Sequence, residues 1–212
     1  MIDTVSFQND RGEWLFPYEQ YGIIMKTHVI SPPKPKVHRF SLDGMDGDLD
    51  ATEWAGEVRY EPRTAEISFR DMSAEQYEAL VQFVLGRNVK IFFSEAQDLY
   101  LYGRCEKLGT ETRDRVTDLD LSFTCKPYRF ARFLTTVSLT VDTSGETVLC
   151  ARRMSAKPTI VTSAAMTLSF GGTTYNLDSG TSTPNMTITD QPQTLTITGS
   201  GTISITWQDG VL

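Results

Sequence analysis

The sequence predicts a mainly β protein, in which an N-terminal β-barrel or sandwich-like domain with one α-helix is followed by a smaller C-terminal β-sandwich. Short segments in which apolar and polar residues alternate dominate the chain, and only one segment has helical periodicity. The composition also changes sharply near residue 132. At 212 residues, with 40% hydrophobic and 22% charged residues, the chain can bury a core without disulfides.

The first part of the chain is rich in short alternating segments. Such alternation is typical of strands with one face towards the core and the other towards solvent. The expected strands are residues 13–16, 22–29, 37–42, 58–60, 65–69, 90–93, 99–104 and 119–125.

The one expected helix covers about residues 74–85. Ser73 is a suitable N-cap, and Gln76 completes a capping box with it. Gly86 can adopt the left-handed conformation that ends a helix. Apolar residues at spacings of three and four form one stripe, which we expect to cover one face or end of the sheet: Tyr77, Leu80, Val81, Val84 and Leu85.

A second domain is expected to begin after residue 132. The first 132 residues contain 17 basic and 22 acidic residues, and the last 80 contain only 3 and 5. Serine and threonine number 15 in the first part and 28 in the second, which favours domains 1–132 and 133–212. Expected strands in the second part are residues 133–141, 158–161, 166–170, 173–177, 186–189, 195–198 and 203–207, with Gly171-Gly172 as a hairpin turn.

Charge and composition exclude several function classes. The net charge of −7 disfavours a surface that holds nucleic acid by neutralising phosphates. No apolar run is long enough to span a bilayer, and the polar start does not resemble a signal peptide. Three scattered cysteines, Cys105, Cys125 and Cys150, do not form a disulfide framework or a metal site, so we expect them to be reduced and buried. No cofactor is expected.

An acidic, glycine-containing run between two expected strands invites a test for calcium binding. Asp46, Asp48 and Asp50 match loop positions one, three and five, and Glu57 matches position twelve. Position six, however, is Ala51 instead of glycine, and no helices flank the run. We therefore interpret it as a tight acidic turn that follows a strand, and we predict no metal site.

The sequence contains no recognisable catalytic pattern. A serine or cysteine nucleophile needs a base, and only His28 and His38 are present, without a nucleophile elbow. No phosphate-binding glycine loop occurs. Pairs of carboxylates for a hydrolase remain as a third reading, but acidic residues are too abundant for any pair to be informative. We predict that the chain is not an enzyme.

The ordered motifs of the chain resemble the distal tail protein (Dit) family of long-tailed bacteriophages that infect Gram-positive hosts. The resemblance extends over the single helix and the C-terminal domain. Its most specific residues are Phe40, Ser41, Leu42, Asp43, Gly44, Met45, Asp46, Gly47, Asp48, Leu49 and Asp50, then Gly56, Tyr60 and Arg63, the strand at 66–69, and Cys125, Lys126, Pro127 and Tyr128.

The resemblance implies a structural hub of the phage tail tip or baseplate. In that family six copies form a ring, and the C-terminal domain is a galectin-like β-sandwich outside the ring. The implied partners are further copies of the chain, the tail tube protein, the tape measure protein, the tail-tip protein and, in some phages, receptor-binding proteins. The implied location is the virion tail tip, assembled in the bacterial cytoplasm. DNA would pass only through the lumen, where the acidic balance suggests a negative lining that repels it.

A carbohydrate-binding or adhesion module is the alternative function. The galectin likeness suggests sugar binding by the C-terminal domain, with the rings of Tyr175 and Trp207 as candidates. The chain departs from the galectin site because no histidine follows His38, so these rings are more simply core residues.

Overall fold

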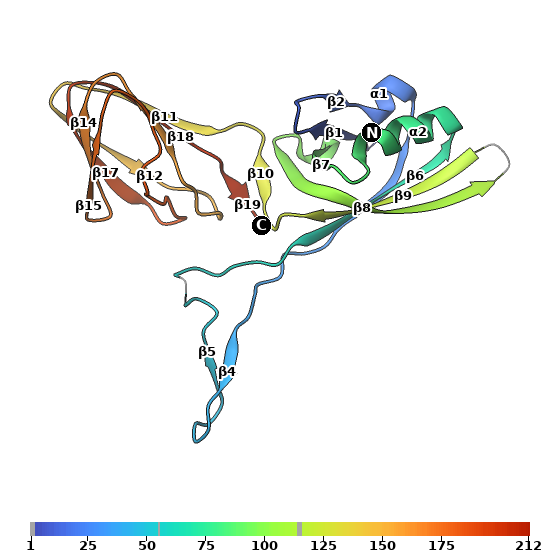
Figure 1. The fold of residues 1–212 in the computed structure, drawn as a ribbon, viewed down its shortest axis with the longest axis horizontal. Helices are drawn as coiled ribbons and strands as arrows, with labels where there is room; N and C mark the ends of the chain where they lie inside the picture. Colours follow the sequence, from blue (N-terminus) through green and yellow to red (C-terminus); the bar gives the residue numbers. More distant parts are fainter. Residues whose placement is uncertain (1–2, 55, 114–115) are drawn as a thin grey trace. The chain divides into compact units, whose positions relative to one another are not determined.

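The computed structural model describes residues 3–54, 56–113 and 116–212, which form two compact units. Unit 1 is Met1–Arg129 and unit 2 is Phe130–Leu212 (Figure 1). Each unit has its own cluster of buried apolar side chains. The predicted mainly β fold class is confirmed.

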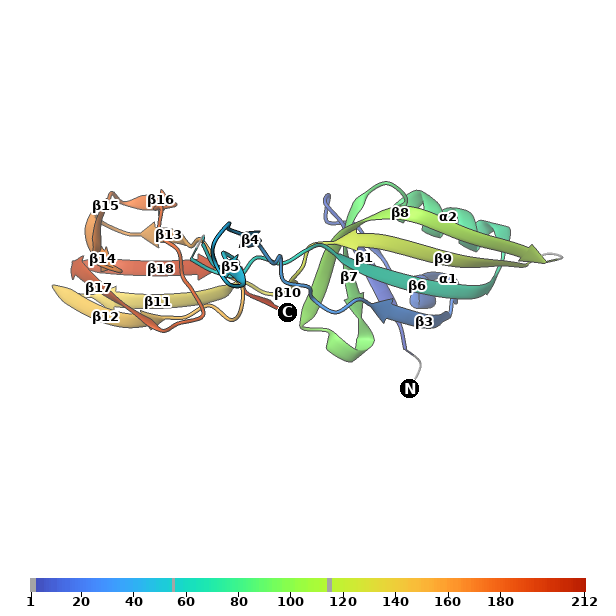
Figure 2. The same cartoon turned by 90° about the horizontal axis from the view of Figure 1, so that it is seen from below.

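Unit 1 is built on one antiparallel sheet in the order β2-β1-β7-β8-β9-β6-β3. Figure 2 shows β8, β9, β6 and β3 side by side. The strands are β1 (Val5–Asn9), β2 (Trp14–Leu15), β3 (Met25–Ile30), β6 (Arg63–Met72), β7 (Asn88–Phe93), β8 (Leu99–Arg113) and β9 (Val116–Cys125). β1 and the long extension of β8 were not predicted.

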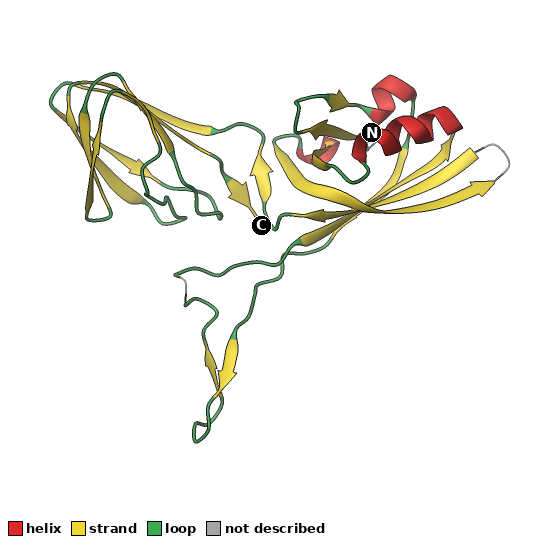
Figure 3. Ribbon diagram, in the orientation of Figure 1, coloured by secondary structure: helices red, strands yellow, loops and turns green. Residues whose placement is uncertain are grey.

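Two α-helices of unit 1 lie on the same side of this sheet (Figure 3). The helix α2 (Ala74–Val84) has the predicted capping box, in which Ser73 Oγ accepts the Gln76 N–H and the Gln76 side chain accepts the Ser73 N–H. The helix ends at Val84, and Gly86 follows with a φ of 68° while its N–H donates to Cys105 O.

The prediction of a single helix was wrong. A short α1 (Pro17–Tyr21) precedes β3, with Pro17 in its first turn and Gly22 in the left-handed conformation at its end. Five residues are too few for a periodic stripe, so only the end signals of Pro17 and Gly22 marked it in the sequence. A short 3-10 helix, η1 (Ser94–Ala96), follows β7.

The core of unit 1 lies between the sheet and α2. Leu80 and Val84 of α2 are fully buried, as the helical stripe predicted. Phe7 of β1 stacks on Phe123 of β9 with ring centroids 5.9 Å apart. Burial of such aromatic and aliphatic side chains is the main source of the stability of this unit.

Unit 2 is a sandwich of two four-stranded antiparallel sheets, ordered β11-β18-β13-β16 and β12-β17-β14-β15. Inward side chains of both sheets form one core, which includes Ile160, Ile205, Leu168 and Ile197. The strands are β11 (Thr135–Val141), β12 (Ser144–Leu149), β13 (Thr159–Thr162), β14 (Met166–Phe170), β15 (Thr173–Leu177), β16 (Gly180–Ser182), β17 (Gln193–Gly199) and β18 (Gly201–Trp207). Short β10 (Arg129–Ala131) pairs with β19 (Gly210–Val211).

The strands agree with the sequence prediction at one hairpin and differ from it at two segments. Gly171 and Gly172 join β14 to β15 with φ angles of 56° and 77°, so this hairpin prediction is confirmed. Two predicted strands, residues 58–60 and 186–189, were wrong because each contributes only one isolated bridge, Pro35–Tyr60 and Ala156–Ile188. No helix in the described part of the chain is long and apolar enough to cross a membrane.

Candidate functional site

The acidic run of the family motif lies at the end of a long two-stranded excursion from unit 1, residues 32–62, which we call the arm (Figure 1). Its strands β4 (Arg39–Ser41) and β5 (Asp48–Asp50) pair with each other, and Phe40 lies opposite Leu49. Between them, the Met45 N–H donates to Leu42 O at 3.1 Å, and Gly44 and Gly47 have φ angles of 85° and 84°. These positive φ angles explain why glycine stands at both turn positions.

The motif aspartates are arranged as turn and strand residues. Asp50 Oδ1 accepts the Thr52 N–H at 2.9 Å, and Asp50 Oδ2 lies 4.0 Å from Arg39 Nε. Hydrogen bonds from Thr52 are the main cause that lowers the pKa of Asp50. Among the described residues, no three His, Cys, Asp or Glu side chains gather as a metal site.

No described side chain of the arm belongs to a buried apolar cluster, and every residue from 34 to 50 is exposed. It nevertheless carries large apolar side chains with exposed fractions between 45% and 83%: Val37, Phe40, Leu42, Met45, Leu49 and Trp54. An isolated two-stranded ribbon is marginally stable in water at best. Contiguous exposed apolar surface is typical of a site that contacts another molecule.

The root of the arm, in contrast, is firmly held. The buried Arg63 donates from Nε to Ser31 O at 2.9 Å and from Nη1 to Pro127 O at 3.4 Å. Burial lowers the pKa of Arg63, and the positive charge of Arg129 adds to this effect. Tyr60 also packs edge-on against Tyr128, with ring centroids 5.8 Å apart. The motif residues Arg63, Tyr60 and Tyr128 therefore meet where the arm leaves the sheet.

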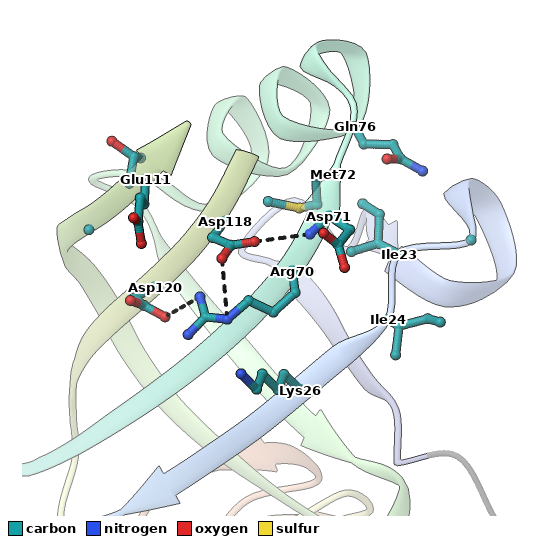
Figure 4. Close-up of a pocket in the computed structure, with 13 residues that line it drawn as sticks. Ile23, Ile24, Lys26, Arg70, Asp71, Met72, Gln76, Glu111, Asp118 and Asp120 are labelled. Carbon is teal, nitrogen blue, oxygen red and sulfur yellow. Dashed lines mark hydrogen bonds and ion pairs between the residues drawn. The ribbon is translucent and has the colours of Figure 1, made fainter. Parts of the chain in front are cut away.

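A groove of about 860 Å³ lies at another end of unit 1 (Figure 4). Arg70 lies between Asp118 (3.5 Å) and Asp120 (3.4 Å), and Asp118 also accepts the Asp71 N–H at 3.1 Å. This contact holds Asp71 at a φ of 55° where β6 bulges. Arg70, Asp118 and Asp120 of the groove thus bind one another, an arrangement that stabilises the bulge.

The two cysteines of unit 1 are buried thiols. Burial is the main cause that raises the pKa of Cys105 to about 11 and that of Cys125 to about 12. Such thiols are poor nucleophiles because the thiolate is the reactive form. Cys150 of unit 2 is exposed, so the prediction of buried cysteines was wrong for this residue. All three cysteines are free.

The two rings proposed for sugar binding lie in different environments within unit 2. Trp207 is only 4% exposed, and its Nε1–H donates to Asp209 Oδ1 at 3.1 Å. Tyr175 is half-buried against the core and donates from its hydroxyl to Asn185 O at 3.3 Å. Trp207 therefore has no free ring face on which a sugar could stack, and sugar binding stays a prediction.

Comparison with known proteins identifies the fold. No protein-family model and no curated protein sequence matches the chain. Among solved structures, the chain is similar over its whole length to the SPP1 Dit protein, described as a paradigm of the hub adsorption apparatus in phages that infect Gram-positive bacteria. The similarity covers 100% of both chains with a TM-score of 0.64 and 16% sequence identity.

The chain has the Dit fold. A chain of the phage p2 baseplate in its activated conformation is a second structural neighbour, with a TM-score of 0.49, 9% identity and 98% of each chain covered. The motifs of the arm and of its root thus lie in a chain whose two units both match a Dit protein, as the resemblance in sequence implied.

Sequence reasoning missed the most exposed feature of the molecule. It placed residues 37–42 in an ordinary strand, because Phe40 and Leu42 alternate with polar residues as in the strands of the sheet. The available signal was the combination of Pro32, Pro33 and Pro35 with the paired glycines of the turn, which separates this hairpin from the sheet.

Proposed function

We propose that this protein is an assembly hub of a phage tail tip, in which copies of the chain join into a ring, with six copies as the resemblance implies. The ring would connect the tail tube and the tape measure protein to the tail-tip and host-adsorption proteins. Its full-length likeness to a hub adsorption protein supports this role. Assembly would take place in the bacterial cytoplasm, with DNA passing only through the lumen.

The arm is the observation that carries the proposal. It exposes five large apolar side chains over the continuous exposed stretch and a sixth at Trp54, yet its root is fixed by Arg63. A rigidly rooted but unsupported hairpin is suited to gain its core from another molecule. Because the arm is unlike any surface that receives it, the contact is heterologous, and heterologous contacts between identical chains can close into a ring.

The two units would serve different parts of the hub. Unit 1, which corresponds to the predicted domain 1–132, carries the arm and would form the ring. Unit 2, which corresponds to the predicted domain 133–212, presents sandwich surfaces rich in serine and threonine, to which receptor-binding or other adsorption proteins could attach. We propose no catalytic role, since the described groove holds paired charges and the buried cysteines have raised pKa values.

Light scattering on a shortened arm tests the proposal. Residues 37–58 are replaced by Asn-Gly, which can close a hairpin next to the Pro35–Tyr60 bridge. We expect the full chain to show a mass that rises with concentration to a defined oligomer, and the shortened chain to remain monomeric with unchanged unfolding of both units. Equal masses for the two chains would contradict the proposal.

A further inference from the structure

One half of the outer face of the unit 1 sheet carries aromatic rings where polar residues are expected. The strand register aligns Trp14, Gln8, Lys90 and Tyr102 across β2, β1, β7 and β8 on the face opposite the core. The same face carries Ser, Thr and Glu further along, on β6 and β9. A sheet face turned to solvent is normally polar, so this half is unusual.

The rings form a continuous row. Phe16 stacks on Trp14 at 5.4 Å, Trp14 lies 5.0 Å from Phe92, and Phe92 lies 5.3 Å from Tyr100. Phe92 is only 6% exposed although it lies outside the main core cluster, because its neighbours Trp14 and Tyr100 flank it. Trp and Tyr are the residues most enriched at the energetic centres of protein interfaces.

Positive side chains surround this row in a chain that is acidic overall. Lys90 Nζ lies 5.2 Å from the Tyr100 ring centroid, and Lys126 Nζ lies 5.0 Å from that of Tyr102. Arg11, Arg87 and Arg104 line an adjoining hollow of about 360 Å³. Two carboxylates lie among these groups: Asp10 accepts a hydrogen bond from the Tyr102 hydroxyl, and Glu106 accepts one from the Thr124 hydroxyl beside Arg104. We call Trp14, Lys90, Phe92, Tyr100, Tyr102 and Arg104 the basic-aromatic face.

The end of the arm has the opposite chemistry. Residues 40–53 contain five acidic side chains and no basic one. Their apolar members Phe40, Leu42 and Leu49 are each about half exposed, and Phe40 and Leu49 share one side of the ribbon. An acidic, apolar hairpin and a basic, aromatic sheet face are complementary in charge and in the kind of surface that each would bury.

We propose that the basic-aromatic face of one copy is the surface that receives the arm of the next copy. Phe40, Leu42 and Leu49 pack on the rings of Trp14 and Tyr100, and Asp43 and Asp46 approach Lys90 and Arg104. The contact also covers the positive surface of unit 1, so that the assembled ring presents less positive charge to DNA. This inference rests on the proposed function and names the acceptor that the arm requires.

A charge exchange tests the contact on the full-length chain by sedimentation velocity over a concentration series. The face variant is Lys90→Glu with Arg104→Glu, and the arm variant is Asp43→Lys with Asp46→Lys. We expect each variant alone to associate about tenfold or more weakly than the natural chain, because like charges then face each other. An equimolar mixture of the two variants should recover association, because each reversed surface then meets a complementary one.

A matched control separates a local contact from a change in net charge. Lys26→Glu with Lys157→Glu makes the same charge change as the face variant at two exposed positions outside the face, and should associate like the natural chain. A benzoyl-phenylalanine photo-crosslinker in place of Phe40 should join the arm to a peptide that contains Trp14 or Tyr100 of another copy.

The outcomes distinguish this inference from the proposed function. If the face variant associates like the natural chain while the shortened arm abolishes association, the arm docks elsewhere and the inference is wrong. Failure of the mixture to recover association would also overturn it. If the shortened chain associates like the natural one, the arm is not the assembly element, and the proposed function itself fails together with the inference.

Discussion

Arg63 Nε lies 2.9 Å from the carbonyl oxygen of Ser31, so a single buried guanidinium closes the root of the arm. Its Nη1 reaches Pro127 O on the segment that follows β9. One side chain thereby ties together three stretches of chain that are distant in sequence. Arginine offers more N–H donors in one rigid plane than any other side chain, which explains why it stands at this position of the motif.

Replacement of Arg63 tests this role. Arg63→Met removes both hydrogen bonds and leaves two carbonyl oxygens without this donor, so we expect a loss of about 2 to 3 kcal/mol of unfolding free energy. Arg63→Lys should lose less unfolding free energy than Arg63→Met, but should remain less stable than the natural chain. Urea unfolding measures the loss, and Arg59→Met, which removes an exposed ion pair with Glu57, should cost less than about 1 kcal/mol. Equal losses for both positions would contradict the role of Arg63.

Asp209 should be equally important for unit 2. Its buried carboxylate accepts hydrogen bonds from Thr135 Oγ1, Trp207 Nε1 at 3.1 Å and the Arg152 N–H at 3.1 Å. Asp209→Ala leaves these buried donors without their acceptor, so we expect a loss of about 3 kcal/mol of unfolding free energy. Thermal unfolding followed by tryptophan fluorescence reports it. Asp178→Ala, which removes an exposed carboxylate of the same unit, is the matched control and should change little.

Gly103 of β8 lies opposite Cys125 of the neighbouring strand β9, which approaches too closely to leave room for a side chain. A Cβ atom there would come within 2.5 Å of Cys125 Sγ and 2.6 Å of Thr124 O. Gly103→Ala should therefore destabilise unit 1 by about 1 to 3 kcal/mol through overpacking. Gly109→Ala is the control on the same strand, since the nearest atom to its Cβ would be 3.4 Å away. A similar effect of both substitutions on the urea midpoint would show that the close approach of β9 at Gly103 is not the constraint.

The thiols should differ sharply in reactivity. At pH 8 a pKa of about 11 leaves Cys105 with about a hundredfold less thiolate than its ordinary value of 9.0 would give. We expect iodoacetamide to label Cys150 in the native chain, and Cys105 and Cys125 only after unfolding. Mass spectrometry of the labelled peptides gives the answer. Rapid native labelling of Cys105 would contradict its burial.

The same raised pKa values predict a direction for the pH dependence of stability. Between pH 9 and about 11 the folded chain keeps the protons of both Cys105 and Cys125 while the unfolded chain loses them, and Cys125 keeps its proton up to about pH 12. The stability that these groups contribute is therefore complete below pH 9 and is lost as the pH rises through this window. Urea unfolding at increasing pH checks the sign, and Cys125→Ala should show a shallower decline.

Local signals in the sequence predicted part of the fold. The capping box of Ser73 and Gln76 and the stripe through Leu80 and Val84 act within one helix, so they could be read without tertiary information. The Gly171-Gly172 turn is local in the same way. α1 was not predicted, because five residues are too few to show helical periodicity and only Pro17 and Gly22 marked its ends.

The candidate surfaces depend on relationships that a sequence does not display. Phe40 and Leu42 have the alternation of any half-buried strand, and only the absence of a facing layer makes them exposed. The basic-aromatic face depends on the register of two strand pairs, β2 with β1 and β1 with β7. This register brings Trp14 of β2 beside Phe92 of β7. The role of Arg63 was marked by its place in the motif, but its partners Ser31 and Pro127 are set by the fold.

Native mass spectrometry of the full-length chain tests the central claim most directly. We expect a closed oligomer with six times the 23.8 kDa mass of the chain, and we expect it to disappear when residues 37–58 are replaced by Asn-Gly. A full-length chain that stays monomeric over the whole concentration range, or a shortened chain that forms the same oligomer, would contradict it.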